Sequence, residues 1–166
     1  MAPALVWDGP PIDDIGTSWQ SDPDVARTVA EAVRRDLSPD AAAERVARFA
    51  ESLSKDGREA RLTRLFAGIF TDINAERGRV IDMIRTYARA QATLLARIDD
   101  DRTALERLSG QQPADRKAIE DLAARIDMAQ RVLEDRERAL RPLCEQPVLL
   151  EQKLGRLARI IQGQLE

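Results

Sequence analysis

Residues 98–126 read IDDDRTALERLSGQQPADRKAIEDLAARI, and this stretch decides the fold. Large aliphatic residues before Ser109 and after Pro113 recur at alternating steps of three and four, the spacing of helices that pack along one seam. The intervening sequence Ser-Gly-Gln-Gln-Pro is typical of a turn. We therefore predict two helices joined by a tip at 109–113.

The three-four pattern continues on both sides of the tip. It occupies residues 62–108 before the tip and residues 119–161 after it. The second segment keeps its phase through Pro142 and Pro147, which either kink one helix or divide it into two helices stacked end to end. Segments of about equal length on either side of a turn favour an antiparallel helical hairpin.

Folding the chain at the tip brings seam positions together in pairs whose residue numbers add to about 224, so that Ile98 meets Ile126. Gly68 then falls opposite Gly155, which would allow the two helices to approach closely. Asp101 interrupts the apolar seam. We expect its carboxylate to meet an arginine, either the next residue in the sequence or one on the second helix.

Apolar residues near the open end of the hairpin cover more surface than one seam can bury. Asp-Pro at 22–23 and Ser-Pro at 38–39 are helix start signals, and they predict covering helices at about 23–36 and 39–55. Gly57 is expected just past the end of the second helix. The predicted fold is all-α: a long antiparallel helical hairpin (a coiled-coil stalk) with a small four-helix base and an extended N-terminal arm.

Four segments follow from this reading. They are an extended or disordered arm at 1–22, base helices with the start of the first hairpin arm at 23–75, the antiparallel coiled-coil stalk at 76–147, and a C-terminal helix that closes the base at 148–166.

The arm at 1–22 is the first candidate site, because it is acidic and proline-broken yet contains both tryptophans, Trp7 and Trp19. Burying such a side chain is worth about 2–3 kcal/mol, enough to hold a short segment on its own domain or on a partner. Three alternatives stay open: the arm packs on its own base, it docks on a protein partner, or it is disordered. We favour an extended arm that lies along the base helices.

The tip is the second candidate site. Residues 112–118 read QPADRKA and resemble the acidic coiled-coil tip of bacterial factors that enter the secondary channel of RNA polymerase. That resemblance implies transcription control, with a tip carboxylate near the polymerase magnesium, and it singles out Asp115 and Arg116 for partner contact. The sequence departs from the family at Gln112, where the family has an acid, and it lacks the zinc-ribbon cysteines. Pro113 and Asp115 also suit positions N1 and N3 of a helix.

The composition argues against most catalytic chemistry. The 166 residues include no histidine and a single cysteine, Cys144, so the commonest general base and zinc ligand are missing and no intrachain disulfide can form. Neither GxxxxGK[ST] nor GxGxxG occurs. We therefore predict a protein that is not an enzyme, with no catalytic, cofactor-binding or metal site. Cys144 is expected to be a small, partly buried apolar residue.

The charge pattern and the hydropathy narrow the partners and the compartment. A net charge of −3 argues against nucleic-acid binding, and the lack of any run of 18 apolar residues argues against integral membrane association. No basic amphipathic face favours a membrane surface, and no secretory leader is evident. With 23 arginines and 3 lysines, the sequence suggests a GC-rich, bacterial genome, and we expect a cytoplasmic protein.

The leading prediction is an interaction protein (a scaffold, adaptor or regulator) that binds protein partners through helical coiled-coil surfaces. The alternative is a transcription or secretion-apparatus regulator that uses the hairpin tip as a probe. Ile81, Leu95 and Val132 flank the seam, and pairing two hairpins would cover them, so we also expect a homodimer.

Overall fold

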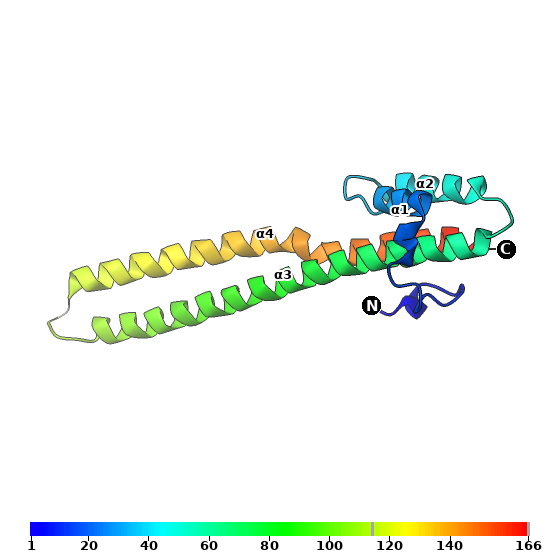
Figure 1. Cartoon of the computed structure of the whole chain (residues 1–166). Coiled ribbons are helices and arrows are strands. Elements are labelled where there is room, and N and C mark those ends of the chain that lie inside the picture. The colour runs from blue at the N-terminus through cyan, green and yellow to red at the C-terminus, as the bar shows by residue number, and fades with distance from the viewer. Residues whose placement is uncertain (114, 166) are drawn as a thin grey trace. The chain divides into compact units, whose positions relative to one another are not determined.

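A computed structural model describes residues 1–113 and 115–165. Within them the chain forms helices and no strand (Figure 1). The elements are the 3-10 turns η1 (Pro3–Leu5) and η2 (Ser18–Ser21) and the α-helices α1 (Pro23–Ala32), α2 (Pro39–Ser52), α3 (Arg58–Ser109) and α4 (Arg116–Gln162). The all-α prediction and the turn between two long helices are confirmed.

The chain divides into two compact units. The first, here the core unit, comprises Met1–Arg79 and Pro147–Glu166, and the second, the two-helix unit, comprises Val80–Gln146. Each unit therefore contains one part of α3 and one part of α4.

The two short helices begin where the sequence predicts. Asp22 Oδ1 accepts hydrogen bonds from the backbone N–H groups of Asp24 and Val25 at 3.1 and 3.2 Å, and Ser38 Oγ accepts one from the N–H of Ala41 at 3.2 Å. Each cap is followed by proline at the first helical position, where no N–H is needed. Both helices end about one turn earlier than predicted.

Gly57 has a different role from the predicted one. Its φ of +74° lies in the left-handed region, and its carbonyl accepts the N–H of Arg61 at 3.0 Å. Gly57 therefore starts α3. The C-cap of α2 is Leu53, in an extended conformation.

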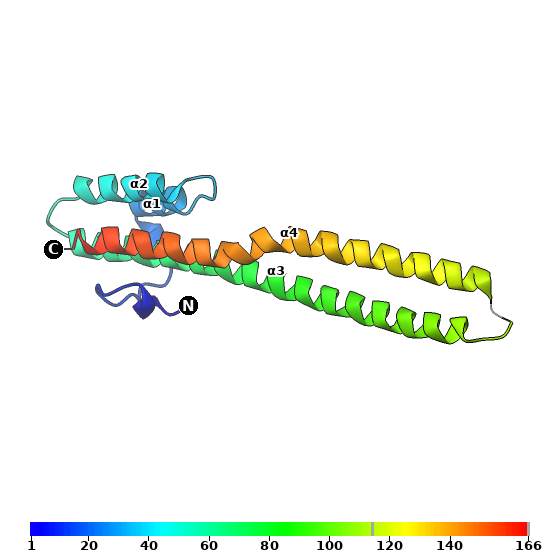
Figure 2. The same cartoon turned by 180° about the vertical axis from the view of Figure 1, so that it is seen from behind.

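The core unit packs its helices and its N-terminal arm around one apolar cluster. Figures 1 and 2 show α2 on one side of α3 and the arm on the other. The largest fully buried side chains are Leu62, Leu65, Phe66 and Ile69 of α3, Leu154, Leu157 and Ile161 of α4, Val25 and Val29 of α1, and Val46 of α2. The predicted covering helices thus bury the wide apolar faces.

Gly68 marks the point where the arm and α1 reach α3. A Cβ atom at this position would lie 2.6 Å from Val29 Cγ2 and 2.8 Å from Trp19 Cδ2. At Gly155 the nearest neighbouring atom would be Arg159 Nη1, at 3.7 Å. The predicted close approach of Gly68 to Gly155 is wrong, because the space at Gly68 is filled by Trp19 and Val29.

In the two-helix unit, α3 and α4 pack through a narrow seam. Ile98, Leu122 and Ile126 are buried, and the apolar residues packed against them are Leu94, Ala104, Leu105, Leu108, Ala129 and Leu133. Gln91 Nε2 donates to the Leu133 carbonyl at 3.3 Å, which agrees with the predicted register. Arg125 on α4 makes a bidentate ion pair with Asp101, at 2.8 and 2.5 Å, as expected for the polar seam position.

The two prolines of the second long helix do not interrupt it. α4 runs from Arg116 to Gln162 as one helix. Pro142 and Pro147 each lack the N–H that would bond to the carbonyl four residues earlier. Because α4 nevertheless continues through both prolines, the alternative of two helices stacked end to end is excluded.

Candidate interaction surfaces

The first candidate residue, Trp7, lies in the core of its own chain. Its ring stacks on Phe66 with a centroid distance of 4.0 Å and an interplanar angle of 6°. Its Nε1–H donates to the Pro10 carbonyl at 2.8 Å, so the polar edge of the indole is satisfied. A Cβ at Gly9 would lie 2.3 Å from the indole, which explains why glycine occupies this turn.

Trp19 is buried to the same extent, with 6 % of its surface exposed. Its ring fills the space above Gly68, and its Nε1–H has no hydrogen-bond partner among the described residues. The amino group of Met1 donates to Asn74 Oδ1 at 3.0 Å and holds the start of the arm on α3. The favoured prediction is confirmed: the arm lies along the helices of its own chain, and both indoles are buried against them.

Asp22 joins the arm, α1 and α3. Arg61 Nε and Nη2 donate to its two carboxylate oxygens at 2.7 and 2.9 Å, and the Arg61 guanidinium lies 5.4 Å from the centre of the Phe49 ring. The hydrogen bond from Arg61 lowers the pKa of Asp22 below its ordinary value, and the backbone N–H groups of α1 lower it further, against the effect of burial.

Two other titratable groups of the core unit are partly removed from water. Lys153 Nζ donates to the Arg34 carbonyl at 2.8 Å, and burial lowers the pKa of this ammonium, with Asp36 opposing the shift. Burial raises the pKa of Asp72, with Arg79 opposing. Lys153 closes the end of α1, a structural role, and neither group has a second reactive side chain positioned by the contacts described.

At the tip, Asp115 and Arg116 are both exposed. Asp115 Oδ1 accepts the N–H of Ala118 at 3.0 Å, so this residue is the N-cap of α4, and its predicted N3 position is wrong. The N1 position is Arg116, because α4 begins there and not at Pro113. Ala114 belongs to residues 112–118, which resemble the tip of the RNA polymerase factors, and it lies outside the described residues.

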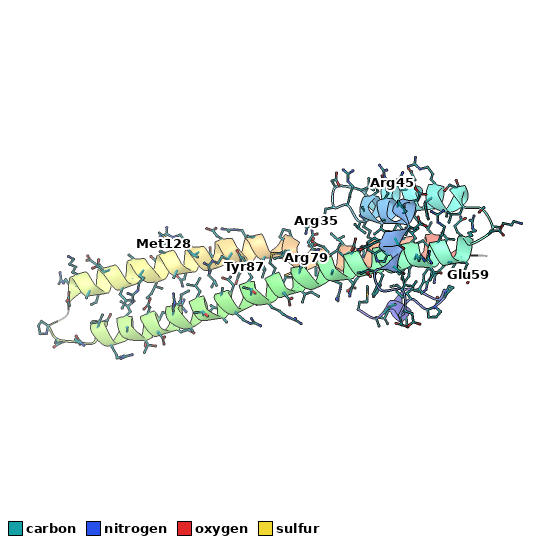
Figure 3. All side chains as sticks on the ribbon, in the orientation of Figure 1. Arg35, Arg45, Glu59, Arg79, Tyr87 and Met128 are labelled. Atoms are coloured by element: carbon teal, nitrogen blue, oxygen red, sulfur yellow. The ribbon has the colours of Figure 1, made fainter. Side chains whose placement is uncertain are left out.

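The side surfaces of the two-helix unit carry exposed apolar groups. Met83 is 51 % exposed, Leu95 46 % and Met128 59 %. Figure 3 shows Met128 on the side of α4 that points away from α3. Cys144 is also exposed, which corrects the expectation of partial burial.

These residues fall on two different sides of the helix pair. In an antiparallel pair, heptad positions g and c of both helices share one side, and positions e and b share the other. The g and c side is here called the methionine side. Counted from the buried seam, it contains Met83, Ala90 and Arg97 of α3 and Met128, Val132, Asp135 and Ala139 of α4. Leu95 lies on the other side.

The two sides differ in charge. The methionine side contains three arginines and three aspartates: Arg97, Arg107, Arg125, Asp100, Asp121 and Asp135. The other side, here the acidic side, contains four arginines and six acids: Arg85, Arg102, Arg116, Arg141, Asp99, Glu106, Glu120, Asp127, Glu134 and Glu137. The spacing of apolar residues does not indicate this division, whereas charges counted by heptad position reveal it from the sequence alone.

No helix in the described part of the chain is both long enough and apolar enough to cross a membrane. Among residues 1–113 and 115–165, no three acidic, cysteine or histidine side chains are placed to hold a metal ion. Comparison with protein-family models, with curated proteins and with solved structures finds no match.

Proposed function

We propose that this chain is a non-enzymatic interaction protein of the bacterial cytoplasm, a homodimeric scaffold or adaptor that binds a protein partner along its two-helix unit. One observation carries the proposal. The seam between α3 and α4 is complete, yet Met83, Leu95 and Met128 remain about half exposed beside it. Large apolar side chains on the outside of an otherwise finished helix pair favour contact with further helices.

The acidic side suits a partner of complementary charge. Leu95 provides an apolar anchor between Ala88 and Ala92, which are small enough for a partner helix to approach. The surplus of carboxylates around this anchor favours a basic partner surface and raises its association rate. A rigid helix pair loses little conformational entropy when it binds, which supports its use as a docking surface.

The tip alternative is less well supported. A probe that works through a carboxylate needs that carboxylate free, whereas Asp115 Oδ1 is hydrogen-bonded to the N–H of Ala118. The side surface, with Leu95 at its centre, is therefore the better candidate for partner binding.

Affinity capture from the native cell tests this function. The wild-type chain and Ala96→Glu should recover the same partner, because Ala96 is exposed on the face of α3 away from α4. Leu95→Glu should reduce recovery at least about tenfold, since it places an unpaired charge at the apolar anchor. Asp115→Asn keeps a side-chain cap and should leave recovery unchanged.

Two results would overturn the proposal. One is equal recovery of the partner by wild type and Leu95→Glu. The other is loss of the partner with Asp115→Asn and not with Leu95→Glu, which would move the function to the tip.

A further inference from the structure

We propose that a second copy of this chain docks on the methionine side of the two-helix unit, antiparallel to the first copy. The twofold axis passes close to Val132 and Thr93. This inference rests on the homodimer of the proposed function and specifies the surface, the orientation and the contacts that form it.

The apolar groups of this side are arranged for close helix packing. Met83 and Met128 are 51 % and 59 % exposed, and Val132 between them is half-buried. Ala90 and Ala139 are exposed and small, so the backbones of two copies can approach while the flexible methionines fill the space between them.

Charge selects this side for self-association. Its three arginines and three aspartates balance, so two copies can meet there without net repulsion. The acidic side has two more acids than arginines, and two copies meeting through it would place like charges together. The same difference leaves the Leu95 side free for a partner of another kind.

The positions of the charges select the antiparallel orientation. The hydrogen bond from Gln91 to the Leu133 carbonyl fixes the register, which puts Arg97 at about the level of Met128 and Asp135 at about the level of Ala90. A twofold axis midway between these levels sets Arg97 of each copy at the level of Asp135 of the other, so opposite charges share a level across the interface. A parallel pair would instead place the Arg97 residues of both copies at one level.

The two charged residues are available for such a contact. Among residues 1–113 and 115–165, no carboxylate lies within ion-pair distance of Arg97. Within the described part of the chain, Asp135 is paired only with Arg138, one turn further along α4, and both side chains are more than two-thirds exposed. A pair this exposed contributes little and is readily exchanged for a contact across an interface.

The surface is tested with the purified full chain by analytical ultracentrifugation at tens of micromolar. The wild type should sediment as a dimer of 18.6 kDa chains. Met83→Glu and Met128→Glu should each raise the dimer dissociation constant at least about tenfold, because each would bury an unpaired carboxylate. Leu95→Glu adds the same charge at a site of similar exposure on the other side, and it should stay dimeric.

The orientation is tested by charge exchange. Arg97→Glu alone and Asp135→Arg alone should each weaken the dimer, since each sets like charges at the same level twice across the interface. Mixing the two single variants should restore dimerisation, because residues 97 and 135 that share a level across the interface then carry opposite charges. Circular dichroism should show unchanged helix content in all five single variants, since the sites are outside the seam.

Several outcomes would overturn the inference. They are a monomeric wild type, a dimer insensitive to both methionine variants, a dimer lost with Leu95→Glu, and single charge variants that fail to form a mixed dimer. A monomeric protein that still captures its partner would leave the proposed docking function standing. A dimer with the expected sensitivities that captures no partner would overturn that function alone.

Discussion

The core unit and the two-helix unit bury their helices to very different degrees. In the core unit, four helical segments and the arm enclose one large cluster that includes both tryptophans and Phe66. In the two-helix unit, the apolar cluster contains three buried residues, and Gln91 and Asp101 interrupt the seam. Aromatic residues follow the same division, since Tyr87 is the one aromatic residue of the two-helix unit.

The difference in burial indicates which unit contributes more to the stability of the fold. A side chain surrounded by several helices loses most of its surface, whereas a seam between two helices leaves every flank open to solvent. The free energy of unfolding should therefore come mostly from the core unit. Exposed large apolar side chains occur on both units: Met83, Leu95 and Met128 on the two-helix unit, and Leu5, Val148 and Leu149 on the core unit.

The largest expected effect tests this division directly. Phe66 is fully buried and stacks on Trp7, so Phe66→Ala should lower the free energy of unfolding by about 3–5 kcal/mol. Ile98→Ala removes the best-buried aliphatic side chain of the seam, and it should cost less because two helices can close in on the space. Urea denaturation gives the two values, and hydrogen exchange assigns each loss to a unit. Equal losses of unfolding free energy in the two variants would contradict the greater contribution of the core unit to stability.

The next effect concerns the arm. Gly68→Ala should lower the free energy of unfolding by about 1–3 kcal/mol, because the new methyl group would meet Trp19 and Val29 at less than 3 Å. The tryptophan emission should shift to the red as the indole is displaced. Gly155→Ala is the matched control. Its Cβ has no close neighbour, and it should stabilise α4 by about 0.5–1 kcal/mol. A loss of stability in Gly155→Ala, together with unchanged stability in Gly68→Ala, would contradict this packing.

Asp22→Ala should cost about 1–2 kcal/mol at neutral pH, because it removes the cap of α1 and the partner of Arg61. The pKa of Asp22 is lowered in the folded state, so its contribution is complete above the ordinary value of 3.8 and is lost as the pH falls through the folded pKa. The difference between wild type and Asp22→Ala should therefore shrink in acid. A difference that is constant with pH would show that the Arg61 contact does not stabilise the fold.

Much of the fold follows from local signals in the sequence. The caps Asp22 and Ser38, the breaker at 109–113 and the seam spacing depend on residues within one or two turns of each other, and the structure contains them all. The register also follows, because pairing around a short turn leaves one consistent alignment, and Gln91 confirms it.

Contacts between distant segments could not be predicted in this way. The seam pattern pairs Gly68 with Gly155 because it considers only the two long helices, whereas the arm competes for the same space. The ion pair of Asp22 with Arg61 joins residues 39 positions apart, and no periodicity indicates it. For the candidate site, the sequence indicated exposed flanks beside the seam. It left open the position of Trp7 and Trp19, because an apolar arm can bind either its own chain or a partner.

Within the two-helix unit, Gln91→Leu should raise the free energy of unfolding by about 1 kcal/mol. The Gln91 Oε1 atom is buried without a partner among the described residues. Leaving this acceptor unsatisfied destabilises the fold by more than the long 3.3 Å hydrogen bond from Nε2 stabilises it. The variant should also tolerate other alignments of the helices, since a polar seam residue fixes the register. Denaturation and cysteine crosslinking between positions 94 and 129 measure the two effects. Lower stability in Gln91→Leu would reverse the interpretation.

The smallest effect concerns a charge in the better-buried unit. Burial raises the pKa of Asp72, so ionisation of this carboxylate opposes folding, and the cost is complete above the raised pKa and absent below the ordinary value of 3.8. Asp72→Asn should therefore stabilise the protein at pH 7, by less than about 1 kcal/mol, and have no effect near pH 3. Asp100→Asn, at an exposed site of the two-helix unit, provides the control and should change stability little at either pH. Urea denaturation of the three proteins at both pH values measures the differences. If Asp72→Asn instead lowers stability at pH 7 and this loss disappears near pH 3, the ionised carboxylate stabilises the core unit, through its attraction to Arg79.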